Sequence, residues 1–266
     1  MRLDVGSILG IVVALSAILL GNALEGGHLS ALIQPTAFLI VVGGTLGATM
    51  LGFPLPVFLR AARALREVFS NDPRDEQQLI EEMVEYAQKA RRDGIIALEG
   101  PLETASDPFL RKALMLAVDG ADSKAMRDNL ELLINHYEED KEQLYKVWES
   151  AGGYAPTIGI IGAVMGLIHV MQSLADVSAV GKGIAVAFVA TIYGVGLANL
   201  LLLPVAFKLK LKLKAETKLL EMMTEGGLAI QEGMNPSLIR EKLASFYGEE
   251  KKSESARAAS SAEVHT

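Results

Sequence analysis

Residues 183–207 read GIAVAFVATIYGVGLANLLLLPVAF, a run without Asp, Glu, Lys, Arg or His. An α-helix needs about 20 apolar residues to cross the roughly 30 Å hydrocarbon core of a bilayer. Three other stretches, 5–24, 26–59 and 150–175, are as long and also lack Asp, Glu, Lys and Arg. The sequence therefore predicts an all-α, polytopic membrane protein. Its four transmembrane helices are expected at about 5–24, 33–53, 151–173 and 183–206.

Two alternative interpretations of these runs are weaker. Buried core helices of a soluble protein are usually shorter and carry a polar face, whereas this 266-residue chain has a mean hydropathy of +0.31. The first run follows Arg2 and has some features of a secretory signal peptide. However, Asp4 cancels that charge, the run exceeds a typical signal-peptide core, and Gly21-Asn22-Ala23 is a poor cleavage site. An uncleaved helix is favoured.

Composition and motifs exclude several kinds of site. The chain has no cysteine, which rules out disulfides and thiolate metal sites. Its net charge of −7 argues against a nucleic-acid binder, which would present a basic surface. The sequence contains no GxGxxG or Walker motif, no HxxxH pair and no nucleophile–base constellation. We therefore expect no enzyme activity, no bound metal and no cofactor.

The distribution of basic residues predicts the orientation in the membrane. The link 25–31 has no Lys or Arg, and the link 174–182 has only Lys182. Basic residues instead follow spans two and four: Arg60, Arg63, Arg66, Arg74, Lys208, Lys210, Lys212, Lys214 and Lys218. Both termini should therefore be cytoplasmic. The predicted domains are 1–56 and 150–207 in the membrane, and 57–149 and 208–248 in the cytoplasm.

The cytoplasmic segment 57–149 is predicted to be helical. Apolar residues at helical spacing indicate a helix over 75–92, and Gly94 suits its C-terminal end. A short helix should follow Asp107-Pro108. A longer one should follow Asp122-Ser123 and run into span three, because no helix breaker intervenes.

The segment 208–248 should also be helical. The alternation KLKLKLK at 208–214 is typical of a strand, but it directly continues a membrane helix, where lysines can reach lipid phosphates. Asn235-Pro236 suits the N-cap and first turn of a last helix that ends near Gly248. The tail 249–266, rich in Ser, Ala, Lys and Glu, is expected to be disordered.

Small residues recur at four-residue spacing in spans two to four, a pattern that lets membrane helices approach closely. The pairs are Gly43/Gly47, Gly159/Ala163, Gly162/Gly166 and Gly194/Ala198. Packing within one subunit and packing between copies of the chain both remain open.

A few polar or helix-breaking residues interrupt the spans. Pro156 and Pro204 each leave the carbonyl four residues earlier without its helical donor, which in a membrane requires a partner or a wet cavity. Thr157 and Thr191 lie among Gly and Pro, and are candidates for lining an ion path. An equally weighted alternative is that their hydroxyls bond back to their own helices. His169 is favoured as a structural or interfacial residue.

The spans contain no Asp or Glu. A proton or cation relay across a bilayer generally needs an intramembrane ionisable group. If this protein conducts ions, another chain must therefore supply the carboxylate.

Three runs resemble the MotA/PomA family, the larger subunits of bacterial flagellar stators, in a superfamily that includes the TolQ and ExbB energisers. They are GYAPTIGIIGAVMGLIH at 153–169, AFVATIYG at 187–194 and LAIQEGMNP at 228–236. The resemblance covers residues 1–247, including the order of spans, the cytoplasmic insert and the tail. It implies an inner-membrane protein that forms a five-membered ring around two copies of a MotB/PomB-type single-span partner. That partner carries the ion-binding aspartate.

The resemblance also implies roles for individual residues. Pro156 and Pro204 match prolines linked to coupling ion flow to movement, and Thr157 and Thr191 best match the channel-lining threonines. Arg91 and Glu99 match charges thought to contact a rotor switch-complex protein, although by themselves they are typical of a solvated helix face. Sodium-type relatives often have Thr where this chain has small apolar residues, which favours protons. The residues concerned are Ala163 and Ala190.

Two other functions remain as alternatives. An ExbB/TolQ-like energiser would couple the proton motive force to outer-membrane processes, but such proteins usually have three spans and an external N-terminus. A passive scaffold would carry no ion flux at all.

Overall fold

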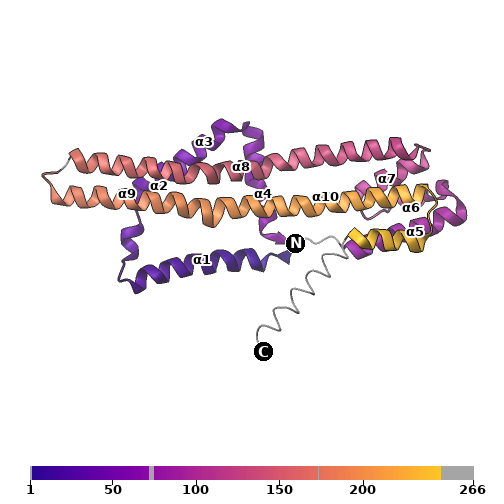
Figure 1. Cartoon of the computed structure of the whole chain (residues 1–266), viewed down its shortest axis with the longest axis horizontal. Helices are drawn as coiled ribbons and strands as arrows, with labels where there is room; N and C mark the ends of the chain where they lie inside the picture. Colours follow the sequence, from indigo (N-terminus) through magenta and orange to yellow (C-terminus); the bar gives the residue numbers. More distant parts are fainter. Residues whose placement is uncertain (1, 72–74, 173, 247–266) are drawn as a thin grey trace, which may run out of the picture. The chain divides into compact units, whose positions relative to one another are not determined.

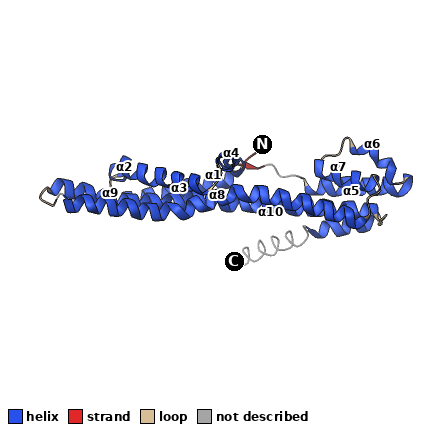
Figure 2. Cartoon of the chain, turned by 90° about the horizontal axis from the view of Figure 1, so that it is seen from above, coloured by secondary structure: helices blue, strands red, loops and turns tan. Residues whose placement is uncertain are grey.

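The computed structural model describes residues 2–71, 75–172 and 174–246. Nearly all of these residues are helical (Figures 1 and 2), which confirms the all-α prediction. Two short strands, β1 (Arg2–Leu3) and β2 (Ser70–Asn71), pair antiparallel. The predicted disordered tail and the predicted helix end near Gly248 lie outside the described residues.

The chain divides into two compact units. The first unit comprises Met1–Asp72 and Asp140–Leu213, and the second comprises Pro73–Glu139 and Lys214–Thr266. Two long helices contribute residues to both units, α8 (Ser123–Gln172) and α10 (Leu203–Gln231). The predicted continuous helices, from residue 123 into span three and from span four through the lysine run, are therefore confirmed.

Four helices of the described residues are long and apolar enough to cross a membrane, as predicted. The first is α1 (Val5–Leu24), which Asp4 caps by accepting a hydrogen bond from the backbone N–H of Ser7 at 3.2 Å. The second begins with a 3₁₀ turn and is interrupted by a π-helical segment: η1 (Leu29–Leu32), α2 (Pro35–Phe38), η2 (Leu39–Gly43) and α3 (Gly44–Gly52).

The other two are the C-terminal part of α8 and a helix in three segments. These segments are α9 (Val177–Leu197), the π-helical η4 (Ala198–Leu202) and α10. Asp176 caps α9, since its carboxylate accepts from the backbone N–H of Ser178 at 2.9 Å. A separate amphipathic helix, α4 (Leu55–Val68), follows span two and buries Ala61, Ala64 and Val68.

Helices α8 and α9 pack backbone against backbone within the first unit, where they lie side by side (Figures 1 and 2). A β-carbon on Gly159 would lie 2.8 Å from the carbonyl oxygen of Ala190. One on Gly194 would lie 2.6 Å from the carbonyl oxygen of Ala155. Only glycine permits this approach, so the small-residue pairs of spans three and four serve packing within one chain.

The pair in span two differs. A β-carbon on Gly47 would meet nothing within 4 Å, and one on Gly43 would only touch the Leu39 side chain at 3.9 Å. The face of span two that carries Gly43 and Gly47 therefore packs against no other helix of this chain. Whether it packs against another copy of the chain remains open.

The second unit is a helical domain around a methionine- and leucine-rich core. Its elements are α5 (Glu76–Asp93), η3 (Ile95–Leu98), α6 (Glu99–Leu102), α7 (Pro108–Val118), the first part of α8, the last part of α10 and a helix over residues 236–246. Met83, Leu114, Met222 and Leu243 are fully buried in the core. The helices predicted here are confirmed, including the Asn235 N-cap, whose side chain accepts from the backbone N–H of Ser237 at 3.0 Å.

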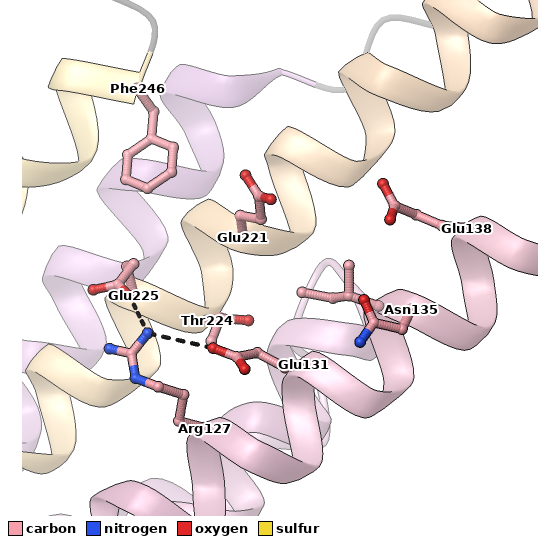
Figure 3. A pocket seen from close by; sticks show the side chains of 9 residues that line it. Arg127, Glu131, Asn135, Glu138, Glu221, Thr224, Glu225 and Phe246 are labelled. Carbon is pink, nitrogen blue, oxygen red and sulfur yellow. Dashed lines mark hydrogen bonds and ion pairs between the residues drawn. The ribbon is translucent and has the colours of Figure 1, made fainter.

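A polar cleft of about 410 Å³ lies between α8 and α10 in the second unit (Figure 3). Glu225 accepts hydrogen bonds at 2.6 Å from both Arg127 and Lys242. Partial burial opposes ionisation of Glu225, but the two charged donors outweigh burial and lower its pKa. Glu221, one turn earlier on α10, also lines the cleft and is exposed.

We predict that Gly194→Ala destabilises the protein by about 1–3 kcal/mol, since the new methyl group would overlap the α8 backbone. Thermal unfolding in detergent measures this effect. Gly196→Ala is the matched control, because a β-carbon there would meet nothing within 4 Å. Equal melting temperatures of the two variants would contradict the close contact between α8 and α9.

We predict that Glu225→Gln lowers the free energy of unfolding by an amount that depends on pH. Because the folded state depresses the pKa of Glu225, its ionised form adds stability above the usual pKa of glutamate, about 4.3. That stability is lost as the pH falls through the depressed value. The variant should thus be less stable than the unaltered protein by about 1 kcal/mol at pH 7, and this difference should shrink progressively below pH 4.

Unfolding midpoints measured from pH 7 to pH 3 check this prediction. Glu221→Gln, in the same cleft, serves as the control and should behave like the unaltered protein at every pH. A loss for Glu225→Gln that stayed constant across the range would contradict the charge-based explanation.

Candidate functional site

The sequence-predicted ion-path and coupling residues of span three lie where α8 crosses α9. A β-carbon on Gly194 would lie 3.2 Å from the Cα of Pro156, so this proline is at the point of closest approach. Thr157 is the next residue on α8, and Thr191 is one turn before Gly194 on α9. Pro156, Thr157 and Thr191 therefore lie within about one turn of the same α8–α9 contact.

The two threonine hydroxyls bond back to their own helices. Thr157 donates to the carbonyl of Tyr154 at 2.8 Å, and Thr191 donates to that of Ala187 at 3.1 Å. This is the ordinary behaviour of hydroxyls in membrane helices. Each bond uses the hydroxyl proton and leaves the oxygen lone pairs free to accept. Thr157 is exposed and Thr191 is half-buried, so the α8 hydroxyl is the more accessible one in a single chain.

Pro204 lies nearly three helical turns beyond Gly194 on the helix that runs from α9 through η4 into α10. It follows the π-helical segment η4 and is the second residue of α10. A β-carbon on Gly152 would lie 2.6 Å from the side chain of Leu203, the neighbour of Pro204, and Gly152 is one turn before Pro156. Both prolines thus lie along the interface that α8 forms with α9 and α10, at separate places on it.

The π-helical segment before Pro204 was not predicted. Proline cannot donate a hydrogen bond to the carbonyl of Leu200, and π-helical turns are one way in which a helix accommodates such a defect. The sequence did contain the relevant cue, since Pro204 is the only proline in the predicted span 183–206. The second π-helical segment, η2, is not directly followed by a proline.

Tyr193 is a further polar residue whose role sequence reasoning missed. Its hydroxyl donates to the carbonyl of Leu32 at 2.5 Å and accepts from the backbone N–H of Gln34 at 3.3 Å. Its ring meets Phe38 edge-on, with centroids 6.4 Å apart. These contacts hold the start of span two against span four. They satisfy the carbonyl of Leu32 and the N–H of Gln34, which lie just before Pro35, the first residue of α2.

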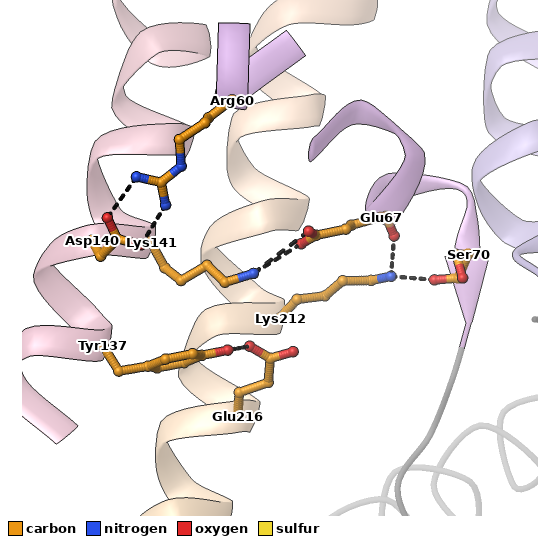
Figure 4. Close-up of polar contacts among 8 residues, drawn as sticks. All are labelled: Arg60, Glu67, Ser70, Tyr137, Asp140, Lys141, Lys212 and Glu216. Carbon is orange, nitrogen blue, oxygen red and sulfur yellow. Dashed lines mark hydrogen bonds and ion pairs between the residues drawn. The ribbon is translucent and has the colours of Figure 1, made fainter. Parts of the chain in front are cut away.

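Polar contacts also attach the amphipathic helix α4 to α8 and α10 within the first unit (Figure 4). Arg60 binds both carboxylate oxygens of Asp140, with one distance of 2.7 Å, and the Lys141 ammonium lies 3.5 Å from Glu67. The hydrogen bond from Arg60 lowers the pKa of Asp140. Lys212 on α10 donates to the main-chain carbonyls of Glu67 and Ser70.

The predicted rotor-contact residues lie in the second unit, where both are exposed. Arg91 is in the last turn of α5 and Glu99 begins α6, on either side of Gly94 with φ of 88°. Neither forms an ion pair with another described residue, whereas the adjacent Arg92 binds Asp93 at 2.8 Å. Their two charges are therefore available to a partner.

The described residues contain no cluster of His, Asp and Glu that could hold a metal ion. His169 is exposed on α8 and has no hydrogen-bond partner among the described residues. The arrangement offers hydroxyl oxygens and helix defects but no titratable carboxylate within the spans.

Comparisons with known proteins agree with this architecture. Residues 8–94 match the model of the motility protein A N-terminal domain, and residues 102–222 match that of the MotA/TolQ/ExbB proton channel family. Motility protein A of Bacillus subtilis (strain 168) is 38% identical over 245 residues, which cover 91% of this chain and 90% of that protein.

Two solved structures are similar over nearly the whole chain. The C. jejuni MotAB structure is 33% identical with a TM-score of 0.86, and covers 91% of this chain and 95% of its own. The flagellar MotAB stator complex from Bacillus subtilis is 38% identical with a TM-score of 0.83, and the match covers 90% of this chain and 94% of that chain. The chain therefore belongs to the MotA/TolQ/ExbB proton channel family, and within it to the motility protein A proteins.

Proposed function

We propose that this chain is the ion-channel-forming stator subunit of a bacterial flagellar motor, which converts proton flow into torque together with a MotB-type partner. Similarity to flagellar MotAB stators over about nine-tenths of the chain is the observation that carries this function. The partner supplies the intramembrane carboxylate, because the spans of this chain contain none. Five copies of the chain surround two copies of the partner.

The protein is a multi-pass protein of the bacterial inner membrane, with both termini in the cytoplasm. The support for this orientation is the basic residues that follow spans two and four, together with the almost uncharged links 25–31 and 174–182. In this arrangement the second unit is cytoplasmic, as are the predicted segments 57–149 and 208–248.

The ion path passes the crossing of α8 and α9. The oxygen lone pairs of Thr157 and Thr191 face the ring interior, where the partner's carboxylate lies, and accept hydrogen bonds along the proton path. Pro156 and Pro204 each weaken a turn of one tightly packed helix pair, so a change in the partner's charge can shift that pair. Arg91 and Glu99 present opposite charges to the rotor switch-complex protein.

A stator is favoured over an ExbB/TolQ-like energiser. The N-terminal motility protein A model matches residues 8–94, which include spans one and two. Energisers of the TolQ and ExbB type usually have three spans, whereas this chain has four helices long enough to cross a membrane among its described residues.

We predict that Thr191→Ala and Pro156→Ala abolish or strongly reduce swimming when they replace the native chain in a strain without another stator. The flagella should assemble normally and the protein should reach its native level, because both changes make the side chain smaller and create no overlap with a neighbouring helix. Thr36→Ala, an equivalent change of an exposed threonine at the start of span two, is the control and should swim normally. Full motility of both site variants would favour a passive scaffold.

We predict that Arg91→Glu lowers swimming speed under viscous load while stator assembly stays intact, because the reversal opposes the rotor's charge. Arg92→Glu is the matched control, since the Arg92 guanidinium is already held by Asp93. Tethered-cell rotation measures torque directly. Identical torque for Arg91→Glu and the native chain would show that Arg91 does not contribute to the rotor contact.

A further inference from the structure

The first unit contains an apolar groove of about 510 Å³ that lies outside the proposed ion path. One face of α1 forms its first wall, from Ser7 through Gly10 to Ala14. The opposite wall is the segment Leu197–Lys208, which includes η4 and Pro204, and the end of α4 closes one side. None of the residues of α1 is buried, so the groove separates this helix from its neighbours.

The groove has the depth of one leaflet of a bilayer. At 1.5 Å per residue, the α1 wall from Ser7 to Ala14 extends about 10 Å and the opposite wall extends about 16 Å. Half of the hydrocarbon core of a bilayer is about 15 Å thick. The groove therefore reaches from one membrane interface to about the middle of the bilayer.

Its interfacial end is marked by charged and aromatic side chains. The Lys208 ammonium donates to Asp4 and, at 2.6 Å, to the hydroxyl of Ser7, the first side chain of the α1 wall. Lys212 follows one turn later. Trp148, the only tryptophan of the chain, also lines the groove, and tryptophan is enriched at the level of lipid headgroups.

This end carries an excess of positive charge, because Lys208 pairs with the Asp4 carboxylate, whereas the Lys212 ammonium donates to two uncharged main-chain carbonyls. Burial and the nearby charge of Lys212 lower the pKa of Lys208, which agrees with two cations held close together. A phosphate near these groups would compensate the excess charge.

The lining of the groove suits a hydrocarbon chain. Apart from Ser7, Asn199 and Lys208, the residues that line it are glycines or have apolar or aromatic side chains. A β-carbon on Gly10 would meet nothing within 4 Å, so the centre of the groove is open.

We propose that this groove binds one acyl chain of an anionic phospholipid, whose phosphate lies beside Lys208 and Lys212. The lipid fills the space between α1 and the segment η4–α10 next to Pro204. It comes from the cytoplasmic leaflet under the topology proposed above; the site itself depends only on the four-span architecture.

Fluorescence of the single tryptophan gives a direct test. The full-length protein is reconstituted into phosphatidylcholine vesicles that contain increasing fractions of brominated phosphatidylglycerol or brominated phosphatidylcholine. Bromine on an acyl chain in the groove quenches Trp148. Half-maximal quenching is expected at a several-fold lower mole fraction of the anionic lipid.

Gly10→Leu, which fills the groove, should remove this difference between the two lipids. Gly21→Leu is the matched control on the same helix; a β-carbon there also meets nothing within 4 Å, and Gly21 does not line the groove. Ala14→Leu replaces Gly10→Leu if circular dichroism shows that the latter is misfolded.

Two results would overturn the proposal. Equal quenching by both lipids, unchanged by Gly10→Leu and Ala14→Leu, would mean that bulk lipid alone reaches Trp148. No quenching by either lipid would mean that a second copy of the chain, or the partner, covers the groove.

Discussion

The close contact of α8 with α9 is the interaction on which the rest of the membrane-spanning structure depends. Lipid tails provide no hydrophobic driving force between helices, so association relies on van der Waals contact over closely approached backbones. Gly159 and Gly194 permit that approach, and Pro156 lies within it. The same contact thus holds the subunit together and contains a weakened turn. A small shift of one helix is therefore transmitted to the other instead of being absorbed by flexible side chains.

The second constraint is the absence of any carboxylate in the spans. A stator subunit with this composition can shape an ion path but cannot carry the titrating group, which explains why its relatives are found in complexes named MotAB. Under the function proposed above, Thr157 and Thr191 offer oxygen lone pairs beside the α8–α9 contact, and the charge that changes during transport belongs to the partner. Arg91 and Glu99 are exposed and are not paired with another described residue, so their charges are available to a partner protein.

Most of the fold was predictable from the sequence because its determinants are local. Uncharged runs of about 20 residues locate the spans, and Asp75, Asp107 and Asn235 mark helix starts through side-chain hydrogen bonds. The hydrogen bonds of Tyr193 and the attachment of α4 were not predictable, since each depends on residues far apart in the chain. Of the two π-helical segments, only η4 has a local cue, Pro204. The site was predictable only in part: sequence selected Pro156, Thr157 and Thr191, but only the fold shows that they lie at one crossing.

The central claim is that this chain forms one part of a shared ion path and does not conduct protons alone. Proton flux into liposomes, followed with a pH-sensitive dye under an imposed potential, tests it most directly. The account predicts no flux through the chain alone. Flux should appear when the chain is reconstituted with its MotB-type partner, and should vanish when the partner's membrane aspartate is replaced by asparagine. Proton flux through the chain without any partner would contradict the account.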